Sequence, residues 1–294
     1  MLRAAQFAAR FEYTPTDQTR RAMREMAGQI KTVSAERFAE ELTKLLTLSS
    51  RPSVGLELLR ETGLLAALWP ELLEGYGVEQ NEWHAYDVYH HALATVDASP
   101  SGDLVLRLAA LFHDVGKPRA KDGPRFYGHE TVGEELARAM LARFRFSNQV
   151  VEEVAHLVRQ HMYSADPAIT DAGIRRFIRR IGTDQLQRQF DLRLADAVGS
   201  GLPRRENGNS NFAARVWAEV ARKPAFSVHD IALDGSDVMD LMVRKGLAPQ
   251  GFHGDARVGK ALHWLFEKVT DQPECNERSH LLALLVEYFD ARPA

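Results

Sequence analysis

One segment of this chain is apolar almost all the way around a helix, and it ends on a His-Asp pair. Residues 103–112 read DLVLRLAALF and are followed by His113-Asp114. A helix without a polar face is a buried helix, so this segment predicts a core built from several packed elements. Helical periodicity dominates the rest of the chain, and alternating, strand-like runs are nearly absent. The sequence therefore predicts an all-α fold.

Hydrophobic spacing, caps and helix breakers place the other helices. Residues 34–48 are expected to form one helix with Ser34 as its N-cap, and residues 51–73 two short helices broken at Gly63 and Pro70. Between Gly116-Lys117-Pro118, which end the buried helix, and Gly128 we expect a polar loop or a small hairpin. Residues 199–211, GSGLPRRENGNSN, are the best candidate for a linker. Further helices are expected at residues 85–97, 130–144, 148–162, 171–181 and 183–198, with three or four more in the remainder.

Composition excludes several classes of protein. A formal net charge of -3 argues against a protein that binds polyanions over most of its surface. Local basic patches remain compatible with this net charge. A single cysteine, Cys275, excludes an internal disulfide and a thiolate cluster and fits a reducing, cytoplasmic compartment. No apolar stretch is long enough to cross a membrane. The start, MLRAAQFAARF, imitates an organellar transit peptide, but it continues into a patterned helix.

Histidines and aspartates around the buried helix form a candidate metal-ligand set. Nitrogen and oxygen ligands without thiolate suit magnesium or a mid-series divalent ion better than a structural zinc site. Six ligands exceed the need of one tetrahedral ion, so the set predicts two adjacent ions, a device for phosphoester hydrolysis. Mn, Mg, Ni, Co and Fe all tolerate such ligands. The candidate ligands are His91, His113, Asp114, His129, His161 and Asp196.

The alternative for each histidine is an ordinary hydrogen-bonded residue of the core or surface. The chain supplies its own comparison, because His229-Asp230 is a second His-Asp pair. That pair lacks both a following Gly-Lys and a preceding buried helix, so we interpret it as a helix-entry motif without a metal. His161 follows Val154 and Val158 at helical spacing and should face the interior, whereas His156 should face elsewhere.

The order of these residues resembles that of the HD superfamily of metal-dependent phosphohydrolases. His91, His113, Asp114 and Asp196 match the four core ligands of that family, and His129 and His161 match the two extra ligands of its two-metal members. Lys117 matches the lysine that such enzymes place near the substrate phosphate. The resemblance implies a helical HD domain at residues 81–200, between a helical neck and body at 1–80 and a helical tail at 201–294.

A narrower resemblance covers nearly the full chain. Blocks such as LRLAALFHDVGKP at 106–118, FYGHE at 126–130, LDGSDVM at 233–239 and NERSHLL at 276–282 resemble the second half of bacterial CCA-adding tRNA nucleotidyltransferases and poly(A) polymerases. The N-terminal head of those enzymes has no counterpart here. Arg3 matches the arginine of their nucleotide-reading motif, but the acidic pair of that motif is absent and Gln6 stands where a further arginine is often found. We therefore expect no nucleotide polymerisation by this chain alone, whether through natural loss, a split gene or truncation.

These resemblances lead to the hypothesis of a divalent-metal-dependent phosphohydrolase acting on nucleotides or RNA ends. Asp114 would bridge two ions whose shared water attacks phosphorus, while Lys117 offsets charge on the phosphate oxygens. Arg125 is a second candidate substrate-binding residue. Glu130 is a candidate for proton transfer, although an acid favoured by the helix dipole is the alternative. Candidate substrates are nucleoside monophosphates, deoxynucleotides and 2′,3′-cyclic phosphates.

The competing hypothesis is an RNA-binding module, with tRNA as its partner. A basic stripe lies on one face of the helix at 171–181 and could track phosphates, or it could be a solvated amphipathic face. The stripe consists of Arg175, Arg176, Arg179 and Arg180. A third alternative is one half of a split tRNA nucleotidyltransferase that needs a separate head subunit.

Overall fold

The structure, a computed structural model, describes residues 1–80, 83–123, 125–203 and 209–291. Within these ranges the chain consists of helices joined by turns and loops, with one isolated β-bridge between Asp122 and Arg125. The predicted all-α fold is confirmed. The chain divides into two compact units, Met1–Ser164 with Gln185–Glu206 and Ala165–Asp184 with Asn207–Ala294. The three-part division at residues 80 and 200 stays a prediction.

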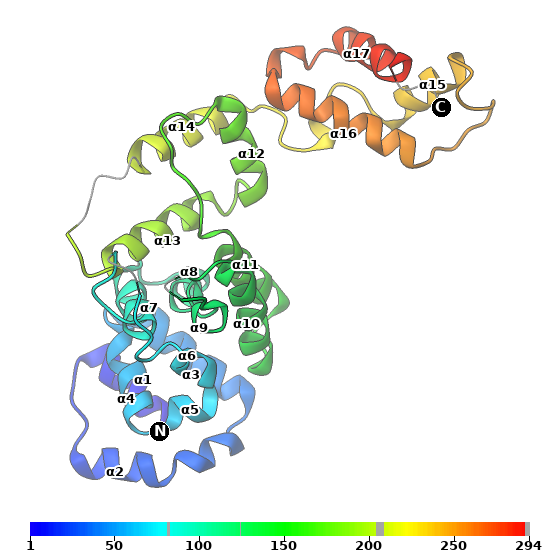
Figure 1. Cartoon of the computed structure of the whole chain (residues 1–294). Coiled ribbons are helices and arrows are strands. Elements are labelled where there is room, and N and C mark those ends of the chain that lie inside the picture. The colour runs from blue at the N-terminus through cyan, green and yellow to red at the C-terminus, as the bar shows by residue number, and fades with distance from the viewer. Residues whose placement is uncertain (81–82, 124, 204–208, 292–294) are drawn as a thin grey trace. The chain divides into compact units, whose positions relative to one another are not determined.

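The first part of unit 1 is a group of helices (Figure 1). These helices pack against one another through leucines and aromatic rings. Ser34 caps α3 as predicted, because its Oγ accepts a hydrogen bond from the Arg37 amide. Residues 51–73 contain three helices where two were expected, because Gly63 takes a left-handed φ of 77° and Trp69-Pro70 starts another turn. The elements are α1 (Leu2–Phe11), α2 (Asp17–Glu25), the 3-10 helix η1 (Ala27–Thr32), α3 (Ala35–Leu48), α4 (Pro52–Glu61), α5 (Leu64–Leu68) and α6 (Pro70–Leu73).

The rest of unit 1 surrounds α8 (Leu104–Phe112), the helix expected to be buried. Every residue from Val105 to Phe112 is buried, and α8 contacts α3, α7, α11 and α13. Its one charged residue, Arg107, donates to the backbone carbonyls of Leu46, Ser49, Ser99 and Pro100. The surrounding elements are α7 (Val88–Ala98), α9 (Lys117–Ala120), α10 (His129–Arg143), α11 (Asn148–Gln160) and α13 (Leu186–Gly199).

The segment after the buried helix was expected to be a polar loop or a small hairpin, and the structure begins it with a short helix. The helix ends at Phe112, and Lys117 and Pro118 then open the short helix α9, where the missing amide of proline costs no hydrogen bond. Beyond Ala120, an antiparallel bridge joins Asp122 to Arg125, in agreement with the small-hairpin alternative.

Unit 2 has its own apolar core, formed mainly by α15, α16 and α17. The predicted linker at 199–211 is partly helical, since α13 includes Gly199 and α14 begins at Asn209; its residues 204–208 lie outside the described residues. In the second His-Asp pair, Asp230 accepts hydrogen bonds from the Ser227 amide and hydroxyl and so caps η2. The elements are α12 (Asp171–Ile181), α14 (Asn209–Ala221), η2 (Val228–Asp230), α15 (Gly235–Arg244), α16 (Ala256–Asp271), η3 (Pro273–Cys275) and α17 (Arg278–Asp290).

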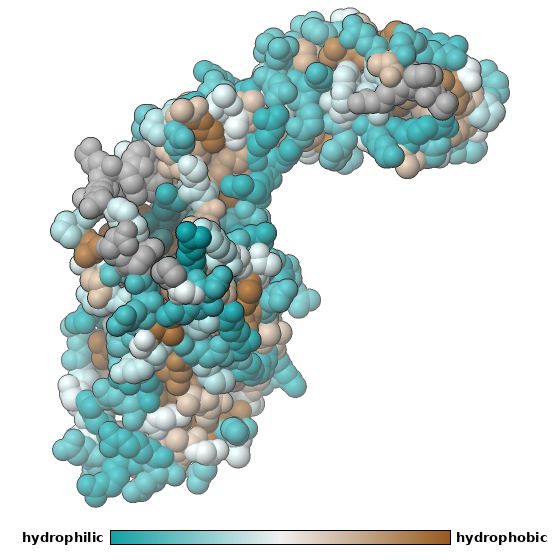
Figure 2. All heavy atoms as spheres, in the orientation of Figure 1, coloured by the Kyte–Doolittle hydropathy of each residue, from teal (hydrophilic) through white to brown (hydrophobic). Residues whose placement is uncertain are grey.

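On the face shown in Figure 2, hydrophilic residues predominate and apolar residues occur in small separate groups. Among the described residues, none of the helices combines the length and the apolar character that a membrane crossing requires.

Candidate metal centre

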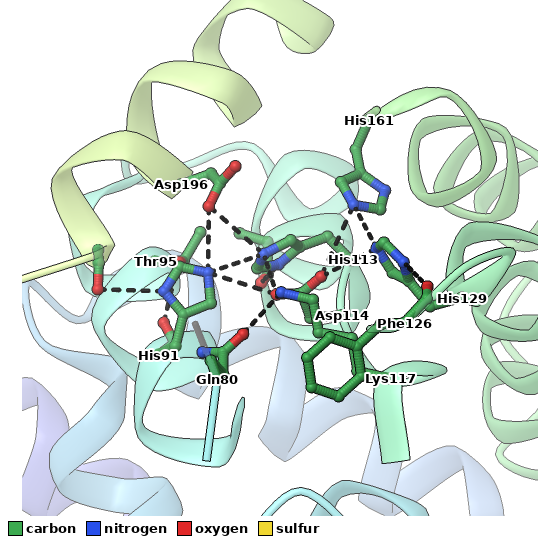
Figure 3. Close-up of polar contacts among 12 residues, drawn as sticks. Gln80, His91, Thr95, His113, Asp114, Lys117, Phe126, His129, His161 and Asp196 are labelled. Atoms are coloured by element: carbon green, nitrogen blue, oxygen red, sulfur yellow. Dashed lines mark hydrogen bonds and ion pairs between the residues drawn. The ribbon is translucent and has the colours of Figure 1, made fainter. Parts of the chain in front are cut away.

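Six histidine and aspartate side chains from five segments of unit 1 converge in one place (Figure 3). These are the six residues that the sequence selects as candidate ligands, and none of them lies apart from the others. They are His91 on α7, His113 and Asp114 in the turn after α8, His129 at the first position of α10, His161 directly after α11, and Asp196 on α13.

The six residues form two clusters that share Asp114. In the first cluster, the Nε2 atom of His91 lies 3.1 Å from Nε2 of His113 and 3.1 Å from Oδ1 of Asp196. In the second, Nε2 of His129 lies 3.2 Å from Nε2 of His161.

Asp114 joins the two clusters because its two carboxylate oxygens face different histidines. Oδ2 lies 3.5 Å from Nε2 of His91 and 3.2 Å from Nε2 of His113. Oδ1 lies 3.3 Å from Nε2 of His129 and 3.7 Å from Nε2 of His161. Asp114 is therefore placed as a bridging carboxylate would be.

Backbone carbonyls orient all four imidazoles in the same way. Nδ1 of each ring lies 2.7–3.1 Å from a carbonyl oxygen, so Nδ1 carries the proton and Nε2 presents a lone pair to the centre. This is the outer-shell arrangement typical of metal-ligating histidines. The pairs are His91 with Gly199, His113 with Ala110, His129 with Phe126, and His161 with Val158.

This donor set fits a divalent cation. Two neutral imidazoles whose Nε2 lone pairs face one another at 3.1–3.2 Å repel unless a proton or a cation lies between them. The arrangement occurs twice, once in each cluster, and each cluster adds at least one carboxylate. Nitrogen and oxygen donors of this kind suit mid-series divalent ions. The residues present therefore fit the binding of divalent metal at this centre.

Two glycine contacts allow the helices to approach closely enough for this convergence. A Cβ on Gly116 would lie 2.2 Å from the carbonyl oxygen of His129, so α10 can begin beside the turn that carries Asp114 only if residue 116 is glycine. A Cβ on Gly199 would lie 2.4 Å from Oγ1 of Thr95. Because residue 199 has no Cβ, α13, which carries Asp196, can pack closely against α7. Close backbone approach is a use to which glycine is suited.

Burial and charge act in opposite directions on the carboxylates. Burial alone would raise the pKa of Asp114, but the neighbouring His113 and Lys117 outweigh it and hold that pKa well below its usual range. The pKa of Asp196 is likewise lowered, since the contact with His91 outweighs desolvation. Both groups are carboxylates at neutral pH, which is the state in which a metal binds them. Asp196 is the most accessible member, with 34% of its side chain exposed.

Burial and neighbouring charge also compete at the histidines, and the outcome differs between His113 and His161. Burial opposes a charge on His113, but Asp114 and Asp196 outweigh it and raise the pKa of this imidazole. At His161, burial dominates and lowers the pKa. His161 is therefore neutral, with its Nε2 lone pair free to bind a cation at neutral pH.

Lys117 connects the centre to a pocket. Its Nζ lies 2.6 Å from Oδ2 of Asp114 and donates to Oε1 of Gln80 at 2.6 Å. The pocket has a volume of about 470 Å³, within the range of small-molecule sites. Asp114, Asp196, His129 and His161 line it together with Lys117.

The other two predicted site residues also line this pocket. The guanidinium of Arg125 stacks over the ring of Tyr127, 5.6 Å from its centroid. Glu130 lies in the first turn of α10 and pairs with Arg159 at 3.2 Å. That ion pair, and the position of Glu130 in the first turn of the helix, favour a structural role over proton transfer.

The predicted arginine stripe on α12 is not a free basic surface. Arg175 is 6% exposed, pairs with Glu219 at 2.7 Å and donates to the backbone carbonyls of Thr270 and Asp271. The hydrogen-bond donors of Arg175 are therefore used inside unit 2, and this side chain is not part of an exposed basic surface.

Two further arginines of the stripe are neutralised at the surface. Arg176 pairs with Asp271 and Arg179 with Glu267, at 2.6 and 2.8 Å. Arg180 lies over the Phe177 ring. Periodicity identified the amphipathic helix but could not reveal acids contributed by α14 and α16.

His84 and Gln80 belong to the site and were missed in the sequence. The ring of His84 packs edge-on against that of His91, with centroids 4.7 Å apart, and it groups with His91 and Asp114 as a further candidate ligand. Burial, followed by the charge of Lys117, lowers the pKa of His84 to about 4. Both residues precede α7 in a segment without helical periodicity, so only the seven-residue spacing from His84 to His91 could have indicated a role.

Comparison with known proteins identifies two family segments. Residues 84–200 match the HD domain, and residues 12–75 match a segment described as the probable RNA and SrmB-binding site of polymerase A. The HD match includes all six residues of the centre.

Several tRNA nucleotidyltransferases are similar to the chain over most of its length. The A-adding enzyme of Deinococcus radiodurans is 36% identical over 90% of this chain and 62% of its own length. The CC-adding enzyme of Thermus thermophilus is 38% identical over 79% of this chain and 52% of its own length. The multifunctional CCA protein of Verminephrobacter eiseniae is 32% identical over 90% and 66%. The chain thus spans about half to two thirds of these relatives.

Proposed function

The chain belongs to the HD-domain proteins that are homologous to the C-terminal part of CCA-adding tRNA nucleotidyltransferases, and we propose that it hydrolyses phosphoesters of nucleotides or RNA ends with the help of divalent metal ions. The HD domain supports metal-dependent phosphohydrolase chemistry at this general level. The observation that carries the proposal is the position of Asp114, whose two oxygens face two separate pairs of imidazole Nε2 atoms.

The ligands divide between two ions. His91, His113, Asp114 and Asp196 would hold one, and Asp114, His129 and His161 the other. When bound, such ions polarise a phosphoester and lower the pKa of water toward neutrality. The nitrogen and oxygen ligands of each cluster suit Mn, Mg, Ni, Co or Fe.

The protein's own side chains position the substrate. The ammonium of Lys117 lies at the pocket wall and donates to Gln80. When substrate binds, this hydrogen bond would be replaced by one to a phosphate oxygen. Arg125, at the same pocket, adds a second cation for the phosphate. Since Lys117 is 8% exposed, its charge acts in a partly dry environment, where it stabilises developing negative charge more strongly than it would in water.

The size of the pocket, the RNA-binding segment and the similar tRNA enzymes support nucleotides and RNA ends as substrates. The pocket is large enough for a small ligand that carries a phosphate. Residues 12–75 match an RNA-binding segment, and the relatives act on tRNA by name. Nucleoside monophosphates, deoxynucleotides and 2′,3′-cyclic phosphates are the classes to screen.

The test is a phosphatase and phosphodiesterase screen of metal-stripped protein to which each divalent ion is returned in turn. We expect turnover only with an added ion, and none from Asp114→Asn or Asp114→Ala. His229→Ala is the matched control, because it removes an exposed histidine of a His-Asp pair outside the centre. Full turnover without metal, or in the Asp114 variants, contradicts the proposal.

The RNA-binding match favours a second function, the binding of tRNA by unit 1. It is compatible with hydrolysis and with a separate subunit that supplies a nucleotidyltransferase head. Gel-shift titration with tRNA at two salt concentrations tests it, since phosphate contacts give a steep salt dependence. Equal affinity at both concentrations would exclude a phosphate-tracking surface.

A further inference from the structure

Two large apolar side chains that line the pocket beside the metal centre are mostly exposed. Tyr127 is 76% exposed and Met162 is 61% exposed. Single exposed apolar residues are common, but these two line the same pocket and come from the two segments that supply the second cluster. Tyr127 lies two residues before His129, and Met162 directly follows His161.

The segment that presents Tyr127 is held in place. Asp122 and Arg125 exchange two backbone hydrogen bonds of 2.9 and 3.0 Å, and the Phe126 carbonyl accepts from Nδ1 of His129 at 2.7 Å. The same short segment therefore fixes the orientation of a candidate ligand and the position of the exposed ring. Two residues span at most about 7 Å, so the Tyr127 backbone lies close to the metal centre.

Cations accompany the aromatic rings of this segment. Arg125 lies over Tyr127, and the ammonium of Lys117 lies 5.6 Å from the ring centroid of Phe126 (Figure 3). Aromatic faces beside phosphate-binding cations are the combination that binds single-stranded nucleic acids and nucleotides, because bases stack on the rings while cations hold the phosphate.

We propose that Tyr127, together with Met162 of the same pocket, is a stacking surface for the nucleobase of the substrate whose phosphate is bound at Lys117. This inference rests on the proposed function and adds the side chain that recognises the base: Tyr127 would favour an unpaired nucleotide, free or at an RNA end, over a phosphoester without a base. Stacking on a tyrosine face tolerates every base, so the site favours the presence of a base over its identity.

Binding to metal-stripped protein tests the inference without turnover. Calorimetric titrations compare AMP, UMP and ribose 5-phosphate on the wild type, Tyr127→Ala and Tyr127→Phe. We expect Tyr127→Ala to lose about tenfold in affinity for both nucleotides, as for one lost base stack, and to bind ribose 5-phosphate as the wild type does. Tyr127→Phe should keep nucleotide affinity, because it keeps the ring.

Tyr13→Ala is the matched control, since Tyr13 is a partly exposed tyrosine of unit 1 that lines a different pocket. Unchanged AMP affinity in Tyr127→Ala, equal loss for AMP and ribose 5-phosphate, or no AMP binding by the wild type overturns the stacking surface. A base-dependent loss in Tyr127→Ala supports it even if no phosphoester is hydrolysed, in which case only the proposed hydrolysis fails.

Discussion

Gly116 and the carbonyl oxygen of His129 are so close that a Cβ at position 116 would lie 2.2 Å from that oxygen. The backbone φ of Gly116 is −79°, so it is space that requires glycine here, and not conformation. Gly116→Ala should push the start of α10 away from the Asp114 turn. We expect a loss of about 1–3 kcal/mol in the free energy of unfolding, from overpacking, together with weaker metal binding. Urea unfolding and metal titration measure the two effects.

Gly28→Ala is the control for that variant, because a Cβ there meets no atom within 4 Å. If Gly116→Ala keeps both the stability and the metal affinity of the wild type, the tight junction between the turn and α10 does not position His129.

The number of ions per chain tests the division into two clusters. His129→Ala combined with His161→Ala removes both imidazoles of the second cluster and leaves His91, His113 and Asp196 in place. We expect manganese content, measured by mass spectrometry after dialysis, to fall from two ions per chain to one. His156→Ala is the control, because His156 lies on α11, the helix that directly precedes His161. This variant should leave the manganese content unchanged. Two ions retained by the double variant would show that the second cluster is wrongly assigned.

Lys117 should have opposite effects on metal binding and on turnover. Its ammonium lies 2.6 Å from Oδ2 of Asp114, an oxygen that also faces His91 and His113. Lys117→Met removes a cation that competes with the metal for this oxygen, so metal affinity should stay equal or rise. Turnover should fall by about a hundredfold or more, as when one donor to a developing charge is removed.

Lys121→Met is the control for Lys117, because this neighbouring ammonium lies over Phe126 at 5.9 Å. Parallel losses of metal affinity and turnover in Lys117→Met would mean that the lysine supports the structure of the centre and not the phosphate.

Cys275 should react slowly in the native protein. The residue is 3% exposed, and burial raises the pKa of its thiol. A raised pKa leaves less reactive thiolate at neutral pH, so labelling by a disulfide reagent should accelerate as the pH rises toward that pKa. Burst labelling at neutral pH in the folded protein would contradict this expectation. In denaturant, the labelling rate reports the opening of unit 2.

The helices were predictable where local signals agree. The Ser34 cap, the buried α8 and the bounds of α12 follow from spacing and capping within single segments. The sequence did not predict three separate helices between residues 51 and 73. Gly63 and Trp69-Pro70 interrupt the helices at intervals too short for hydrophobic periodicity to show.

The candidate site was predictable as a set of residues but not as a geometry. The order of histidines and aspartates, read through a family resemblance, selected the side chains that the structure brings together. The sequence could not show that a backbone carbonyl holds Nδ1 of His91, because that carbonyl belongs to Gly199, 108 residues away. Gln80 and His84 were missed since their segment has no periodic pattern.

The arginine helix shows the same limit, and it gives the last prediction. Arg175 and Glu219 are 44 residues apart in sequence, yet their side chains form a pair in which both are less than 10% exposed. Glu219→Ala leaves a buried guanidinium without its counter-charge, so unit 2 should lose about 3–5 kcal/mol of stability. Glu267→Ala removes a partly exposed partner of Arg179 and should cost less than about 1 kcal/mol. Denaturant unfolding followed by Cys275 labelling compares them, and equal stability of the two variants would show that the buried pair does not hold α12 and α14 together.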